Sequence, residues 1–133
     1  MIWKLGHRGA CGHAPENTLL SFKKALELGV HGFEFDIQLS RDLEPMVIHD
    51  ETLERTTSGK GNVCDFTAEE LQQFDAGKGE RIPTLRNVLD LVDKRCRLFI
   101  ELKAEHSAFP VAEIIKHYVE HMGWSYEQFF VCS

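Results

Sequence analysis

Hydrophobic and polar positions follow two periods along the chain. A period of two is clearest over 32–38, where Phe33, Phe35 and Ile37 alternate with polar residues, as in a half-buried strand. Spacings of three and four mark helices. The pattern predicts strands at 2–5, 32–38, 45–50, 97–103 and 128–133. It predicts helices within 15–29 and at 83–94 and 109–123, and one short helix within the polar stretch 51–80.

Helix ends are signalled by capping residues and glycines. Asn17 or Thr18 is placed to cap the first helix, and Gly29 to end it. Thr67 followed three residues later by Glu70 predicts a capping box for the short helix. Strands that alternate with helices predict parallel βα units in an α/β fold.

Two lengths constrain this fold. About six residues join the strand at 32–38 to the run at 45–50, whereas a parallel crossover takes about a dozen or more. A closed (β/α)8 barrel takes about 250 residues, and this chain has 133. The chain therefore resembles half of such a barrel, with about four βα units and the start of strand five.

Composition and charge narrow the class of protein. The net charge of −6 argues against a nucleic-acid partner, which requires a basic surface. No apolar run approaches the roughly 18 residues of a transmembrane segment, and the first residues do not resemble a secretory signal. The four cysteines are far apart and form no CxxC pair, which favours free thiols in the cytoplasm.

Polar side chains gather at the ends of the predicted strands. In parallel α/β proteins this edge of the sheet is where active sites are built. The strand at 97–103 repeats the alternation of 32–38, with its apolar residues on one face and Glu101 and Lys103 on the other. We therefore expect one site at this edge. The residues at the strand ends are His7, Arg8, Glu34, Asp36, His49, Asp50, Glu101 and Lys103.

Three of these residues are carboxylates suited to a divalent cation. Glu34 and Asp36 are two apart in one strand, so they point the same way, and if that face lines a site, a cation is the obvious reason for two like charges there. With Glu101 they offer three oxygen ligands for Mg²⁺ or Ca²⁺, completed by water and a substrate phosphate. The alternatives are a solvated strand face, a packed His49 and a surface ion pair at Arg8. Repetition at every predicted strand end favours the site.

Four stretches carry longer motifs: GHRGACGHAPENTLLSF at 6–22, GFEFDIQLSRDLEPMVIHDETLERTTSGKG at 32–61, IPTLRNVLDLV at 82–92 and LFIELK at 98–103. Together they resemble the glycerophosphodiester phosphodiesterase family. The resemblance implies a TIM (β/α)8-barrel fold, with 1–133 as the N-terminal part of a single domain and a small insertion at about 51–80. The family continues through four further strands that close the barrel. In its usual Asp-Gly turn, Leu43 replaces the glycine here.

The resemblance also implies a role for each residue that matches the family motifs. The metal carboxylates of the family match Glu34, Asp36 and Glu101. Its acid–base histidines match His7 and His49, and its phosphate-binding cations match Arg8 and Lys103. We further expect Glu16 and Asn17, in the PENT motif, to brace the loop after the first strand.

The implied activity is that of a phosphoric diester hydrolase of lipid and glycerol metabolism. One divalent cation, Mg²⁺ or Ca²⁺, and a histidine pair would hydrolyse a small-molecule glycerophosphodiester to sn-glycerol 3-phosphate and an alcohol. One alternative is a truncated, non-catalytic half-barrel that acts as a folding or assembly unit. Its open sheet edges predict self-association. A related phospholipase, which leaves a cyclic phosphate as its product, is a further alternative.

Overall fold

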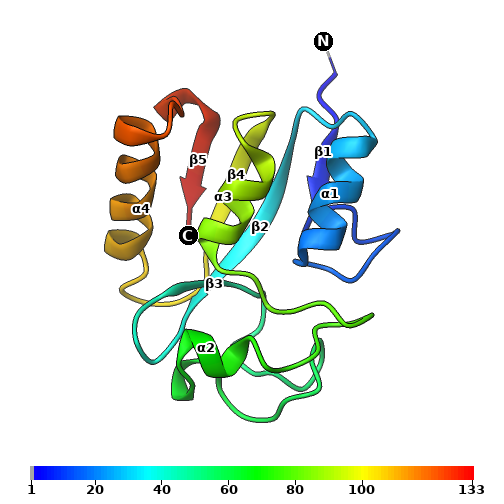
Figure 1. Cartoon of the computed structure of the whole chain (residues 1–133), viewed down its shortest axis with the longest axis vertical. Coiled ribbons are helices and arrows are strands. Elements are labelled where there is room, and N and C mark those ends of the chain that lie inside the picture. Colours follow the sequence, from blue (N-terminus) through cyan, green and yellow to red (C-terminus); the bar gives the residue numbers. More distant parts are fainter. Residues whose placement is uncertain (1) are drawn as a thin grey trace.

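A five-stranded sheet forms the centre of the protein (Figure 1). The structure, a computed structural model, describes residues 2–133. Four strands run parallel in the order β1-β2-β4-β5, and β3 pairs with β2 in the antiparallel direction. The strands are β1 (Leu5–His7), β2 (Gly32–Leu39), β3 (Pro45–Val47), β4 (Arg97–Leu102) and β5 (Phe129–Cys132).

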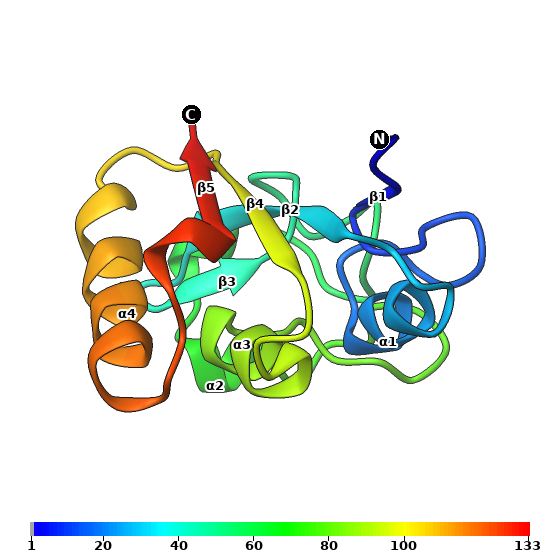
Figure 2. The ribbon, with the colours of Figure 1, turned by 90° about the horizontal axis from the view of Figure 1, so that it is seen from above.

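Three longer helices cover one face of this sheet and leave the other face bare (Figure 2). The helices are α1 (Leu19–Glu27), the short α2 (Ala68–Leu71), α3 (Leu85–Val92) and α4 (Ala108–His121), with 3-10 turns at Val63–Asp65 and Tyr126–Gln128. The main core lies between the sheet and α1, α3 and α4. One-sided coverage of a mostly parallel sheet is the layering found in a (β/α)8 barrel, where the bare face would point to the barrel axis.

The local signals read from the sequence act as expected in these elements. Thr18 and Ser21 form a capping box at α1, and Thr67 and Glu70 form one at α2. In β2, Phe33, Phe35 and Ile37 are fully buried toward the helices. The alternation predicted for 32–38 is confirmed, and it leaves the carboxylates of β2 on the opposite, bare face.

The predicted strand at 45–50 differs from the structure in direction and length. β3 covers Pro45–Val47 and runs antiparallel to β2, with Ile37 opposite Val47. A tight turn at 40–44 makes this possible, because Ser40 and Glu44 pair through their backbones. The short link therefore needs no crossover. Counting this run as a barrel strand was wrong, and β5 is the fourth parallel strand.

The first strand also lies later than predicted. β1 spans Leu5–His7, where Leu5 pairs with Gly32 and His7 with Glu34. Residues 2–4 of the predicted strand instead precede β1, and Ile2 is almost fully exposed. Register with β2, rather than hydrophobicity, sets the position of this short strand.

The segment at 51–80 lies at the end of the sheet to which the parallel strands point (Figure 1). It contains α2 and contributes most of a second, smaller apolar cluster, which includes Leu53, Val63 and Leu71. This cluster also takes in Met46 and Ile48, so the segment is anchored to the chain just after β2. Its place as an insertion within one domain stays a prediction.

Candidate active site

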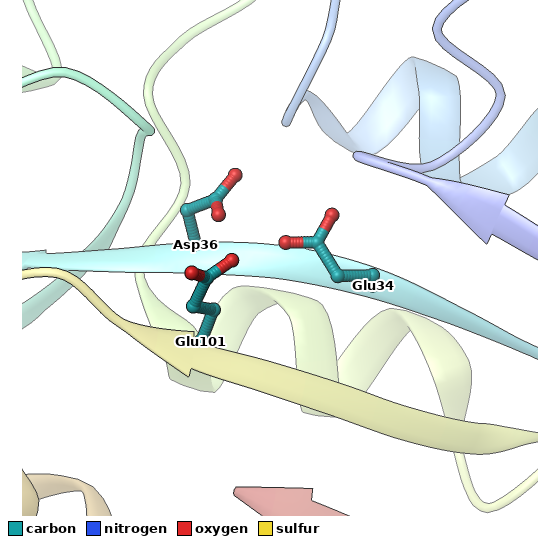
Figure 3. Close-up of side chains that lie close together, drawn as sticks. All are labelled: Glu34, Asp36 and Glu101. Carbon is teal, nitrogen blue, oxygen red and sulfur yellow. The ribbon is translucent and has the colours of Figure 1, made fainter. Parts of the chain in front are cut away.

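The strand register brings the predicted carboxylates together. β2 and β4 are parallel neighbours in which Asp36 lies opposite Glu101, and β1 places His7 opposite Glu34. Because residues opposite each other in a parallel pair point to the same face, all four side chains project from the bare face of the sheet. Figure 3 shows Glu34 and Asp36 rising from β2 beside Glu101 from β4, with their carboxylates turned toward one another.

The three carboxylates form a compact acidic cluster. One oxygen from each lies within 4.8 Å of the others. Burial, reinforced by the neighbouring carboxylate of Asp36, raises the pKa of Glu34 to about 8. Asp36 is 1% exposed, and its Oδ1 is buried without a hydrogen-bond partner. Oxygen ligands under mutual repulsion, one of them unpartnered, are the donor set that a hard divalent cation requires.

The loop after β1 holds Asp36 from the side. Asn17 donates from Nδ2 to Oδ2 of Asp36 at 3.1 Å, and Nε of Arg8 lies 3.4 Å from the same oxygen. The backbone N–H of Arg8 donates to Oε2 of Glu34 at 3.3 Å. Arg8 and Asn17 both have positive φ, at 53° and 56°. Non-glycine residues in this region are strained, and such strain concentrates at functional sites.

Lys103 closes the acidic cluster on the side of β4. Its Nζ donates to Oε1 of Glu101 at 2.9 Å, which raises the pKa of Lys103 above its ordinary value. Next to Lys103 opens a cleft of about 550 Å³. Its walls come from the end of β2 and the turn after it, from 62–64 and from 103–106. The cleft offers space for a small molecule beside the acidic cluster.

His49 is held by its neighbours just beyond β3. Gln38 donates to its backbone oxygen at 3.0 Å, and its Nδ1 lies 2.8 Å from Oδ1 of Asp50. Hydrogen bonds from Arg55 and from His49 hold the pKa of Asp50 well below its usual range. An ionised carboxylate only accepts hydrogen bonds, so this contact favours the His49 tautomer that carries its proton on Nδ1.

Arg55 is the residue of this region that the sequence reasoning missed. It donates to both oxygens of Asp50 and both oxygens of Glu16, at 2.8–3.1 Å. Glu16 also accepts from Arg8 at 3.0 Å. The available signal was its place in the motif stretch 32–61, shortly after His49 and within the polar stretch 51–80.

His7 lies at the open side of the site. Its side chain is 67% exposed, and Nε2 is 3.7 Å from Oε2 of Glu34. His49 connects to the same cluster from the other direction, through Asp50, Arg55, Glu16 and Arg8. The residues predicted at the strand ends therefore form one connected group. The expectation that Glu16 and Asn17 brace the first loop agrees with their bonds to Arg8 and Asp36.

Residues 7–125 match the model of the glycerophosphoryl diester phosphodiesterase family. The chain belongs to this family. It is 47% identical over 117 residues to a glycerophosphodiester phosphodiesterase of Caldanaerobacter subterraneus subsp. tengcongensis, a match that covers 82% of this chain and 48% of that protein.

Solved structures of family members have the same fold. The glycerophosphodiester phosphodiesterase of Agrobacterium tumefaciens superposes with a TM-score of 0.84 at 34% identity, over 98% of this chain and 57% of that one. An Oleispira antarctica phosphodiesterase, determined in complex with the product sn-glycerol-3-phosphate, gives a TM-score of 0.85 at 32% identity and the same coverage. The chain spans about half the length of the curated relatives it matches. The predicted half-barrel of the TIM-barrel class is thus confirmed.

No helix among residues 2–133 combines the length and the apolar character that crossing a bilayer requires.

Proposed function

We propose that this chain carries the metal, phosphate and histidine groups of a glycerophosphodiester phosphodiesterase, a phosphoric diester hydrolase. The proposed reaction hydrolyses a glycerophosphodiester to sn-glycerol 3-phosphate and an alcohol. The observation that carries the proposal is the meeting of Glu34, Asp36 and Glu101 at one sheet edge, in a chain that matches the family over residues 7–125. The Oleispira antarctica relative, solved with sn-glycerol-3-phosphate, supports the choice of product.

We assign one divalent cation, Mg²⁺ or Ca²⁺, to the three carboxylates. The unpartnered Oδ1 of Asp36 and the raised pKa of Glu34 both support this assignment. When bound, the cation would neutralise charge that develops on the phosphoryl oxygens. Both features are relieved by a cation, since it supplies the missing partner and favours ionised Glu34.

Arg8 and Lys103 are the proposed phosphate-binding cations. Both already contact the acidic cluster, Arg8 at Asp36 and Lys103 at Glu101, so they flank the place where a phosphate would lie. Fixed positive groups on both sides stabilise the phosphorane-like charge without reorganising during the reaction. The cleft beside Lys103 would accommodate the alcohol part of the substrate.

His7 and His49 are the proposed acid–base pair. One imidazole removes the proton from the attacking hydroxyl, and the other, protonated, donates a proton to the leaving alkoxide. The resemblance suggests that the attacker is the 2-hydroxyl of the glycerol, which forms a cyclic phosphate that water then opens. Each group contributes about 10²- to 10⁴-fold to the rate. The Nδ1 contact of His49 with Asp50 favours Nε2 as its reactive atom.

We further propose that the bare face of the half-barrel is covered by a second copy. Among the described residues, β1 and β5 end the row of parallel strands, and they run parallel to their neighbours β2 and β4. A twofold axis along the barrel would place β5 of one copy beside β1 of the other in the same direction. The exposed side chains of Leu5 and Phe130 on these edge strands would then be shielded.

The free cysteines support a cytoplasmic location.

The deciding experiment uses purified chain whose mass in solution has been measured by light scattering. It is incubated with glycerophosphocholine and Mg²⁺ or Ca²⁺, with and without chelator, while glycerol 3-phosphate is followed. We expect release that the chelator stops and that His49→Ala removes, with metal binding preserved. A folded sample that releases nothing supports the non-catalytic alternative. A cyclic phosphate that persists supports the lyase alternative.

A further inference from the structure

We propose that Arg55 is a positioning residue that fixes His49 and Arg8 relative to each other, by clamping Asp50 and Glu16 with one guanidinium group. This inference rests on the proposed function, since it assigns Arg55 to the site in which His49 and Arg8 act. Arg55 itself lies outside the acidic cluster and outside the proposed phosphate-binding and acid–base residues.

The clamp consists of four hydrogen bonds from a single side chain. Toward Asp50, Nε of Arg55 donates to Oδ2 at 2.8 Å and Nη2 donates to Oδ1 at 3.0 Å. Toward Glu16, Nη1 donates to Oε1 at 2.9 Å and Nη2 donates to Oε2 at 3.1 Å. A planar guanidinium can form two such forks at once, because its donors lie in a fixed plane, whereas a lysine ammonium cannot.

Each carboxylate passes the constraint to a residue of the site. Oδ1 of Asp50 lies 2.8 Å from Nδ1 of His49, and Oε2 of Glu16 accepts from Nη1 of Arg8 at 3.0 Å. The two loops that carry Glu16 and Asp50 are far apart in the sequence. Among the residues that the structure describes, Arg55 is thus the one whose side chain forms hydrogen bonds to both loops at once.

The electrostatic setting supports a fixed arrangement. Burial acts to raise the pKa of Glu16, but the hydrogen bonds and charges of Arg55 and Arg8 outweigh it and leave the pKa below its ordinary value. Both carboxylates are therefore ionised and accept only. The side chains of Glu16 and Asp50 are 19% and 24% exposed, so these contacts are partly shielded from solvent. A carboxylate that is itself paired and partly buried holds a histidine in one tautomer more firmly than an unpaired carboxylate does.

The test reads the tautomer of His49 directly. The whole chain is labelled with ¹⁵N-histidine and studied by long-range ¹H–¹⁵N NMR without metal or substrate, with the His49 signal assigned by its loss in His49→Gln. We expect mainly the Nδ1–H tautomer in the wild type. Arg55→Gln and Arg55→Lys should each lower the ratio of Nδ1–H to Nε2–H by about fivefold, the scale of one lost net hydrogen bond.

Two further variants make the result specific. Arg86→Gln removes an arginine of similar exposure that is paired with Glu44, and it should leave the tautomer ratio unchanged. Asp50→Ala removes the acceptor itself and should abolish the preference. An unaltered ratio in Arg55→Gln would overturn the proposal, as would an unaltered ratio in Asp50→Ala.

The same variants are then compared in the glycerophosphocholine assay. In a preparation that turns over, Arg55→Gln should lower kcat/KM by about 10- to 100-fold, while Arg86→Gln stays at the wild-type value. Wild-type kcat/KM in Arg55→Gln contradicts the proposal. The tautomer measurement requires no turnover, so the failure of the proposed activity and the failure of the Arg55 clamp are distinguishable.

Discussion

Asn17 donates a hydrogen bond from Nδ2 to Oδ2 of Asp36 at 3.1 Å, between two side chains that are 4% and 1% exposed. The backbone of Asn17 also donates to the carbonyl oxygen of Arg8 at 2.9 Å. One residue therefore fixes a buried carboxylate and the loop that carries Arg8. Because Oδ2 is held in this way, the unpartnered Oδ1 keeps a defined direction.

Asn17→Ala is predicted to lower the free energy of unfolding by about 2–4 kcal/mol. About 1–3 kcal/mol comes from a buried carboxylate oxygen that loses its donor, and about 1 kcal/mol from alanine at a positive φ. Urea unfolding of the wild type and of Asn17→Ala measures the total loss of stability. Asn17→Gly removes the donor without the backbone strain, so it should lose less. Equal stability of Asn17→Ala and the wild type would show that this bond is dispensable.

Glu34→Ala is predicted to abolish stabilisation by Mg²⁺ or Ca²⁺. A ligand that binds only the folded chain adds about 2.7 kcal/mol at 100 times its Kd, or about 10 °C in Tm for a domain of this size. Thermal unfolding with and without the cation measures the shift. Glu113→Gln, an exposed carboxylate on α4, should retain it in full. An undiminished shift in Glu34→Ala rules out a cation at this carboxylate.

The chelated, metal-free chain is predicted to lose stability as the pH rises from about 5 to about 8. The pKa of Glu34 is raised from 4.5 to about 8 by burial and by Asp36. Between these values the folded chain binds more protons than the unfolded chain, so stability falls with rising pH and levels off above about 8. Glu34→Gln should remove this part of the slope, as followed by unfolding at several pH values. The same slope in Glu34→Gln would contradict the assignment.

Leu43→Gly is predicted to stabilise the chain by about 0.5–1 kcal/mol. Leu43 lies in the turn after β2, has φ +63° and is 62% exposed. Its backbone therefore has the left-handed conformation that favours glycine. Relief of about 1–2 kcal/mol of backbone strain exceeds the entropy that glycine adds to the unfolded chain. Leu28→Gly, at an exposed residue with φ −77°, should destabilise instead. If both variants lose stability equally, Leu43 is not strained.

The sequence predicted elements best where one signal dominated. The helix predicted at 83–94 contains α3, and its apolar residues at helical spacing are the ones that the helix buries: Leu85, Val88, Leu89 and Val92. The run at 45–50 was harder, because a short apolar run says nothing about strand direction. The backbone hydrogen bond from Ser40 to Glu44 closes the turn that reverses the chain, and no periodicity in the sequence specifies that contact. The position of β1 likewise depends on its pairing with Gly32.

The residues of the candidate site also differ in how far the sequence predicts their contacts. The meeting of Asp36 with Glu101 followed from alternation and parallel register, both of which are local properties of strands. The fork from Arg55 to Glu16 joins residues 39 apart in the sequence. No periodicity encodes such a contact. It depends on how the segment at 51–80 folds back over the loop after β1.

Gly9, beside Arg8, has φ +81°, and a Cβ there would clash with Oγ of Ser21 in α1. Ser21 also donates to the carbonyl oxygen of Arg8 and accepts from the backbone of Ala10. The backbone segment that carries the Arg8 guanidinium therefore packs against α1 and cannot move independently of that helix. Under the proposed function, a substrate phosphate would therefore meet an arginine that is already held in place before binding.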